Sequence, residues 1–201
     1  MPRTVFYLVR HAPTLWNLEK RIQGQWDSVL APAGQAEAEA LAPRLAGLGL
    51  ARILASDLGR AKSTAGILNL RLRLPVTLDK RLREQHFGEW TGRYWRDLPE
   101  AELRAAEAAG WHFHPPGGES RADVRGRAEH ALVDAARANA GRNVLVVTHQ
   151  GVIKAIVYHL LGRDYLPDEP PAFQPGRLQR IICLDGALSI GELDVDPPLP
   201  S

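Results

Sequence analysis

Cysteine is almost absent from this chain of 201 residues, in which Cys183 is the only one. A single cysteine excludes an intramolecular disulfide and a metal centre held by several thiolates. It also fits a reducing compartment, so we expect a cytoplasmic protein.

Long apolar runs are missing too. The stretch in the N-terminal "MPRTVFYLVRH" is too short for a signal peptide, and no other run approaches a membrane span. We therefore expect no membrane association.

Lysine is also scarce. It stands only at positions 20, 62, 80 and 154, although lysine and arginine together number 25. Most of the positive charge is therefore arginine, whose planar fork suits oxyanions. The formal net charge of +2 is too small to predict nucleic-acid binding. Hydrophobic content of 45% and charged content of 24% are ordinary for a globular protein. With no internal repeat or linker, we expect a single domain over residues 1–201.

Strand-like and helix-like patterns alternate along the chain. Apolar runs predict strands at 4–9, 51–57 and 143–148, with 76–84 extended. Helical spacing predicts helices at 31–50 (shortened or kinked by Pro43), 58–70, 120–140 and 151–162, with helical segments in 91–109. Residues 110–119 and 163–177 are expected to be loops, Asp185–Gly186 a hairpin turn, and the tail from 194 frayed. This alternation predicts an α/β fold: a sheet covered by helices on both faces.

The ends of three predicted strands carry unusual side chains. Arg10 and His11 follow the first apolar strand, Arg60 opens the helix after the second, and His149 follows the third. In an open α/β sheet, ligands bind beyond the carboxyl ends of the strands. If these strands are parallel neighbours, two arginines and two histidines meet at one edge.

Such a cluster repels itself, and a cation at a helix N-terminus, as at Arg60, is unfavourable. A bound anion would remove both costs. A phosphate monoester carries about −1.5 to −2 charge near neutral pH, and guanidinium groups bind it bidentately. The strand ends therefore predict a phosphate site.

Five segments carry a resemblance to a known family. In order, "LVRHAPTLWN", "ASDLGRAKSTA", "LREQHFGEWTG", "PPGGES" and "VVTHQG" resemble the landmarks of the histidine phosphatase superfamily, the phosphoglycerate mutase-like group. The similarity extends from residue 5 to about 160. It implies a three-layer α/β/α sandwich around a mainly parallel sheet, and a metal-independent enzyme without a cofactor that acts on a small phosphorylated metabolite.

The resemblance also implies roles for individual residues. His11 would be the nucleophile that becomes a phosphohistidine, and Glu84 the general acid and base, with Glu89 as the alternative. Arg10, Arg60 and His149 would bind the phosphoryl oxygens. Asn17 would add a hydrogen bond, unless it is simply a turn residue. Gln23 and Gln150 are candidate substrate contacts, whereas Trp26 fits substrate contact and surface packing equally well.

The sequence departs from the family pattern in two places. Ala12 stands where glycine usually follows the nucleophilic histidine, which is tolerable only if the backbone there does not need a positive φ. Gln150–Gly151 stands where glycine commonly comes first, so Gln150 adds a side chain to the expected pocket.

Several functions compete. A phosphatase of small phosphomonoesters is favoured over a cofactor-dependent mutase because the loop at 110–119 has no arginine or lysine and Phe87 replaces the tyrosine usual in mutases. A non-catalytic phospholigand-binding protein would lack a nucleophile or acid, and neither is missing. A metallohydrolase would need a site near His112 and His114, where no acidic ligand has suitable spacing. The hairpin at 180–193 offers an edge for a homodimer.

Overall fold

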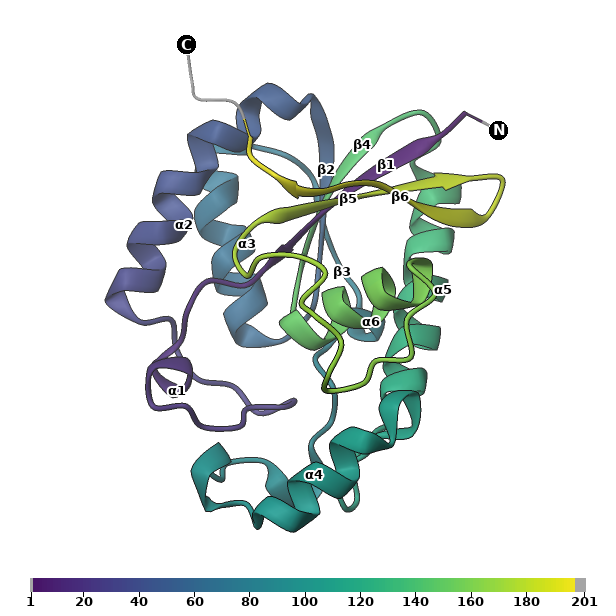
Figure 1. Cartoon of the computed structure of the whole chain (residues 1–201). Coiled ribbons are helices and arrows are strands. Elements are labelled where there is room, and N and C mark those ends of the chain that lie inside the picture. The colour runs from purple at the N-terminus through teal and green to yellow at the C-terminus, as the bar shows by residue number, and fades with distance from the viewer. Residues whose placement is uncertain (1, 198–201) are drawn as a thin grey trace.

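The computed structural model describes residues 2–197 (Figure 1). The strands are β1 (Thr4–Arg10), β2 (Leu50–Ala55), β3 (Val76–Leu78), β4 (Asn143–Thr148), β5 (Leu178–Leu184) and β6 (Ala187–Val195). The α-helices are α1 (Leu15–Leu18), α2 (Pro32–Leu45), α3 (Gly59–Leu72), α4 (Glu100–Ala108), α5 (Arg121–Ala138) and α6 (Gln150–Leu160). No helix in this part of the chain is long and apolar enough to cross a membrane.

The strands form one six-stranded sheet in the order β3-β2-β4-β1-β5-β6. β3, β2, β4 and β1 are parallel, and β5 and β6 continue the sheet in antiparallel pairing. The β5–β6 hairpin turns at Asp185–Gly186, both with positive φ as a tight hairpin turn requires. The fold is therefore the predicted α/β sandwich around a mainly parallel sheet.

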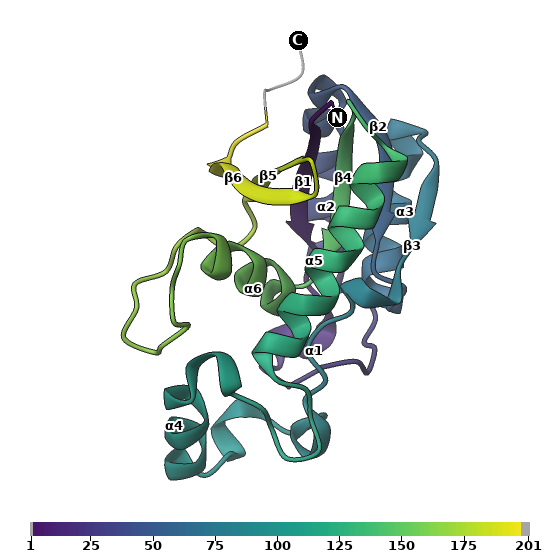
Figure 2. The same ribbon diagram turned by 90° about the vertical axis from the view of Figure 1, so that its right-hand side faces the viewer.

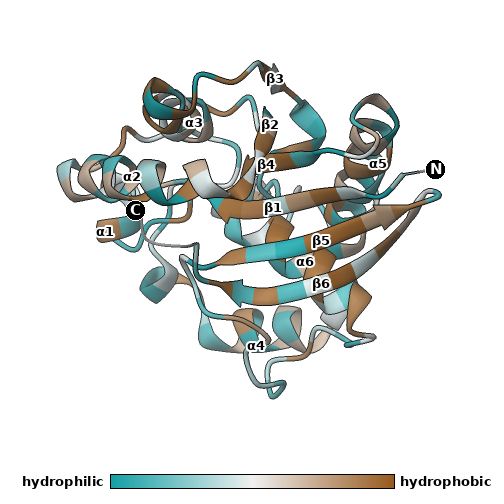
Figure 3. Cartoon of the chain, turned by 90° about the horizontal axis from the view of Figure 1, so that it is seen from above, coloured by the Kyte–Doolittle hydropathy of each residue, from teal (hydrophilic) through white to brown (hydrophobic). Residues whose placement is uncertain are grey.

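Alternate residues of β1 face opposite layers of helices. Phe6 and Leu8 are buried with α5 and α6, whereas Val5, Tyr7 and Val9 are buried with α2 and α3. Figure 2 shows the sheet between these two pairs of helices, and Figure 3 shows the apolar colouring along β1 and β4. A strand buried on both faces must be apolar throughout, which explains the unbroken run before Arg10.

Local signals set the helix ends. Ser120 and Asp123 form the predicted capping box of α5, with each side chain bonded to the other's backbone N–H. α2 begins at Pro32, where a missing N–H costs nothing, and ends two residues after Pro43. The expected shortening by Pro43 is confirmed, because the chain continues as a 3-10 turn at Ala46–Leu48.

Two expectations about extended segments are wrong in part. We expected residues 76–84 to be extended, but β3 ends at Leu78 and a 3-10 turn follows at Lys80–Leu82. The Asp79 carboxylate caps this turn by accepting from the Arg81 N–H at 2.8 Å. We also expected fraying from residue 194, but β6 extends to Val195. Residues 198–201 lie outside the described part.

Candidate active site

The strand ends meet as the sequence predicts. β4 is the parallel neighbour of both β1 and β2, with Arg10 paired to Thr148 and Ala55 to Val147. The chain therefore leaves all three strands at one edge of the sheet, beside a pocket of about 330 Å³. The predicted site residues that line it are Arg10, His11, Asn17, Gln23, Arg60, Glu84 and Gln150.

The imidazole of His11 is held in one orientation by two hydrogen bonds. Its Nδ1 lies 2.8 Å from the Ala12 carbonyl oxygen, and its Nε2 lies 3.1 Å from Nε of Arg60. A carbonyl can only accept, so the proton belongs on Nδ1 and the Nε2 lone pair accepts from the guanidinium. Burial lowers the pKa of His11 well below its usual range, and the charges of Arg60 and Arg10 lower it further. His11 is thus a neutral imidazole with its lone pair on Nε2.

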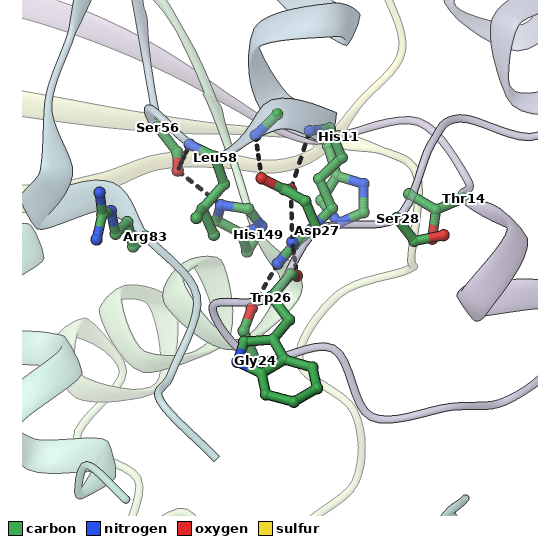
Figure 4. Close-up of polar contacts among 12 residues, drawn as sticks. His11, Thr14, Gly24, Trp26, Asp27, Ser28, Ser56, Leu58, Arg83 and His149 are labelled. Carbon is green, nitrogen blue, oxygen red and sulfur yellow. Dashed lines mark hydrogen bonds and ion pairs between the residues drawn. The ribbon is translucent and has the colours of Figure 1, made fainter. Parts of the chain in front are cut away.

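Arg60 is buried, with 2% of its surface exposed, and is bound by the loop that follows α1. It donates from Nη2 to the Gly24 carbonyl at 2.7 Å and from Nη1 to the Trp26 carbonyl at 2.8 Å. Nη1 also lies 3.2 Å from the Asp27 carboxylate. Figure 4 shows Gly24, Trp26 and Asp27 with dashed lines that mark these contacts.

Asp27 supplies a negative charge at the N-terminus of α3. Its carboxylate accepts the N–H of Gly59 at 2.6 Å and of Arg60 at 3.2 Å, so it caps the helix from a distant loop. We expected from the sequence that a bound phosphate would offset the misplaced charge of Arg60. Asp27 already supplies an anion there, so that reason for a phosphate is wrong.

Arg10 is a cation of the site that has no partner among the described residues. Within residues 2–197 its guanidinium makes no hydrogen bond or ion pair, and its Nε is buried without a partner. Burial lowers the pKa of Arg10, and the nearby Glu84 and Glu37 carboxylates act in the opposite direction. A desolvated guanidinium without a partner is costly unless an anion binds it. Arg10 is therefore the strongest sign of an anion site.

His149 lies directly beside His11, with ring centroids 5.1 Å apart (Figure 4). It is fully buried and is not on the pocket wall. Its Nε2 lies 2.8 Å from Ser56 Oγ, and its Nδ1 has no partner in the described chain. Burial, then His11 and Arg60, lower the pKa of His149 well below its usual range. Both histidines are therefore neutral, so the positive charge at the three strand ends comes from Arg10 and Arg60.

The Glu84 carboxylate is bound by two backbone N–H groups. Oε1 accepts from Gln85 at 2.8 Å, and Oε2 accepts from Gly151, in the first turn of α6, at 3.1 Å. Arg127 of α5 fixes the segment by donating to the Glu84 carbonyl at 3.1 Å. Glu89, the alternative acid, is exposed and does not line the pocket. The geometry favours Glu84.

The remaining predicted residues are also placed. The Asn17 Oδ1 accepts from the Thr14 N–H and hydroxyl, which leaves its Nδ2 as the donor available to the pocket. Gln23 is buried, and its Oε1 has no partner among the described residues. Ala12 does not have a positive φ, so its methyl group is accommodated.

The pocket residues that the sequence reasoning missed include three cations, Arg21, Arg121 and Lys154. Lys154 was detectable, because it follows Gln150 by four residues and so shares its helix face. Trp26 is exposed and contributes only its carbonyl to the site. His112 and His114 do not line the pocket, and within residues 2–197 no group of three or more His, Cys, Asp or Glu side chains is placed to hold a metal ion.

Comparison with known proteins finds chains of similar sequence and fold. A Bacillus stearothermophilus structure named YhfR has a TM-score of 0.86 and 34% identity over 96% of this chain and 98% of its own. A mycobacterial glucosyl-3-phosphoglycerate phosphatase has a TM-score of 0.80 and 32% identity over 97% and 98%. The Enterobacter sp. (strain 638) protein named "Probable phosphoglycerate mutase GpmB" is 35% identical over 88% of this chain and 80% of its own.

The model of one protein family matches residues 6–188, which include all of the predicted site residues. The chain belongs to the histidine phosphatase superfamily, branch 1.

Proposed function

We propose that this protein is a phosphatase of small phosphomonoesters that works through a phosphohistidine on His11 and needs no metal or cofactor. One observation carries the proposal: a neutral His11 with its Nε2 lone pair beside Arg60, in the same pocket as the Glu84 carboxyl group. A neutral imidazole is a competent nucleophile toward phosphorus.

In the first step the Nε2 lone pair of His11 forms a bond to phosphorus while the ester P–O bond breaks. The departing oxygen takes a proton from Glu84, because an alkoxide is a poor leaving group. Arg10, unpaired in the described chain, binds the phosphoryl oxygens and stabilises the charge that spreads over them. Arg60 also stabilises this charge, through its Nε–H. That donor is bonded to His11 Nε2 and becomes free when the Nε2 lone pair turns to phosphorus.

His149 supports the phosphoryl group as a donor rather than as a charge. Ser56 Oγ accepts from the Leu58 N–H at 3.3 Å, and its own proton is then available to His149 Nε2. In that arrangement the second imidazole proton is on Nδ1, the atom left without a partner in residues 2–197. His149 does not line the pocket, but its ring lies 5.1 Å from that of His11, so the neutral tautomer can donate to an oxygen of the phosphoryl group held on His11.

In the second step Glu84, now a carboxylate, takes a proton from water. The water oxygen forms a bond to phosphorus, the N–P bond breaks, and the electron pair returns to His11. Inorganic phosphate then leaves. Glu84 is held by N–H groups on both oxygens, so it keeps one position for both proton transfers.

A panel of phosphorylated metabolites, assayed for released phosphate, tests the proposal. We expect hydrolysis of several small esters and of p-nitrophenyl phosphate, with full activity in excess chelator, because the arginines supply the charge that a metal supplies elsewhere. A strong loss that a divalent metal restores would contradict metal independence. No phosphate release from any ester would refute the phosphatase.

A phosphoglycerate mutase is the second candidate. We expected its extra cations to come from the loop at 110–119, which has none, but Arg121 and Lys154 line the pocket from α5 and α6 instead. The 35% identity to a protein named as a probable mutase favours the same candidate. Hydrolysis is supported by the likeness to the mycobacterial phosphatase and by Phe87 at the pocket wall.

The two candidates differ in the fate of the phosphoryl group. With 3-phosphoglycerate and 2,3-bisphosphoglycerate present, a phosphatase releases phosphate and forms little 2-phosphoglycerate. Isomerisation that outpaces phosphate release by a wide margin would identify the mutase and reject the hydrolase.

A further inference from the structure

The segment "PPGGES", one of the landmarks in the sequence, has no residue on the wall of the catalytic pocket. It packs instead against the backbone that follows Glu84. A Cβ atom on Gly88 would overlap the carbonyl oxygen of Pro116. A Cβ atom on Gly118 would lie 2.6 Å from the carbonyl oxygen of His86. The two backbones touch directly, so the position of one segment depends on that of the other.

Glu119 bonds the two segments together and connects them to α5. Its N–H donates to the His86 carbonyl at 2.9 Å, and its carbonyl accepts from Nε2 of Gln85 at 2.6 Å. Its carboxylate accepts from Nε and Nη2 of Arg127, at 2.6 and 2.9 Å. Only 19% of the Arg127 side chain and 18% of the Glu119 side chain are exposed. Such a shielded bidentate pair holds the guanidinium in one orientation.

The same guanidinium binds the backbone that leads to Glu84. Nη1 of Arg127 donates to the Arg81 carbonyl at 2.6 Å, and Nη2 donates to the Glu84 carbonyl at 3.1 Å. Arg127 thus makes four hydrogen bonds, two to a carboxylate and two to backbone carbonyls. These bonds use the planar fork of arginine, and the compact ammonium group of a lysine could not make them together.

The connection between these two carbonyls is also bound to the sheet. The Leu82 carbonyl accepts from the Thr148 hydroxyl at 2.8 Å. Thr148 ends β4, and its own carbonyl accepts the N–H of His11 at 2.8 Å. The backbone that carries Glu84 and the backbone that carries His11 therefore meet at Thr148. Arg127 fixes the Glu84 side of this frame.

We propose that Arg127, held by Glu119, is a positioning residue that sets how well Glu84 reaches the leaving oxygen. This inference rests on the proposed function and goes beyond it, because neither Arg127 nor Glu119 lines the pocket. The N–H groups of Gln85 and Gly151 orient the Glu84 carboxylate, whereas Arg127 places the backbone behind it. Without these bonds the segment can shift, and a shift of about 1 Å can cost about 10²-fold in rate.

Arg127→Lys tests position separately from charge, because lysine keeps the charge and loses the fork. We expect kcat for an alkyl phosphate to fall by about 10–10²-fold. The loss should be smaller with p-nitrophenyl phosphate, whose leaving group needs less help from an acid, as long as transfer to His11 limits the rate. The inhibition constant of inorganic phosphate should change by no more than about twofold, because Arg10 and Arg60 are untouched.

A double-mutant cycle with Glu84→Gln shows whether Arg127 acts through the acid. Once the proton donor is gone its position no longer matters, so adding Arg127→Lys to Glu84→Gln should lower kcat for the alkyl ester by no more than about twofold. A merely structural role would lower kcat by the same factor with and without Glu84→Gln. That result would overturn the inference, as would equal losses with both esters or unchanged turnover by Arg127→Lys.

Glu119→Gln is the second variant if Arg127→Lys does not fold. It keeps Arg127 but removes the charge that holds it, so we expect about a tenfold loss with the alkyl ester and a smaller one with the aryl ester. Arg137→Met is the matched control, because Arg137 is also on α5 but is exposed and is paired with Asp134 at 3.0 Å. It should leave both kcat values unchanged. A comparable loss in Arg137→Met would overturn the assignment to Arg127.

The outcome is separable from that of the proposed function. Hydrolysis of both esters, with losses that multiply in the cycle, would refute the positioning role and leave the phosphatase standing. If the unmodified protein hydrolyses neither ester, the proposed function fails and the positioning role fails with it.

Discussion

Replacing Gly151 by alanine should damage catalysis while leaving the fold intact. A Cβ atom at this position would lie 2.3 Å from Glu84 Oε1 and 3.1 Å from its Cδ. Both atoms belong to the end of a flexible side chain, so the carboxyl group can swing away. In doing so it loses the hydrogen bond from the Gly151 N–H, now 3.1 Å long. Glu84 then no longer reaches the leaving oxygen.

The structure sets the size of the expected changes in the catalytic rate and in the stability of the fold. Relief of the contact needs a movement on the order of 1 Å, and such a misplacement can cost about 10²-fold in rate. The lost hydrogen bond costs about 0.5–1.5 kcal/mol, and alanine gains about 0.5–1 kcal/mol over glycine in a helix. These terms offset each other. We therefore expect the free energy of unfolding to stay within about 1 kcal/mol of that of the unmodified protein.

The assay compares kcat for an alkyl phosphate and for p-nitrophenyl phosphate, with urea denaturation of the same samples. Glu84→Gln is the reference and should slow the alkyl ester by about 10²–10⁴-fold. Both variants should lose less with p-nitrophenyl phosphate, whose phenolate leaves readily, as long as transfer to His11 limits the rate. Gly66→Ala is the control, because a methyl group at that position would meet no atom within 4 Å. Unchanged turnover of the alkyl ester by Gly151→Ala, or equal losses with both esters, would refute the acid role of Glu84 in this step.

Two further predictions concern charge. The folded protein holds His11 and His149 neutral with lowered pKa values, so below about pH 6.5 the unfolded chain binds more protons than the folded one. The free energy of unfolding should therefore decrease as the pH is lowered through this range, by up to about 1.4 kcal/mol per pH unit for each histidine. Equal stability in urea at pH 7.5 and 5.5 would contradict this. Asp27→Asn keeps one acceptor for α3 but removes the charge beside Arg60, so we expect a loss of about 1–2 kcal/mol in urea and a higher KM. A variant as stable and active as the unmodified protein would show that Asp27 does not hold Arg60.

The sequence predicted the sheet because its central strands are buried on both faces. Such strands are unbroken apolar runs, and Arg10, His11 and His149 stand out where those runs stop. The turn after β3 was missed, because its cause is one side-chain bond from Asp79 to the Arg81 N–H rather than a pattern.

The charges in the site were harder to predict from the sequence than the positions of its residues. Asp27 caps α3 across more than thirty residues, and nothing in its local sequence points to Arg60. The neutrality of the two histidines follows from burial, which the sequence does not reveal. Lys154 could be predicted from the helical period alone, because it lies four residues after Gln150, but the sequence argument considered extra cations only in the loop at 110–119.

The covalent step on His11 is tested most directly by trapping it. The protein is mixed briefly with a phosphate ester that it hydrolyses, and is then denatured in base. The denatured protein is digested and examined by mass spectrometry. We predict a phosphoryl group that is stable in base and labile in acid, located on the peptide that contains His11 and absent from His11→Ala, which should also lose turnover. A phosphoryl group on another residue, or normal turnover by His11→Ala, would contradict the mechanism.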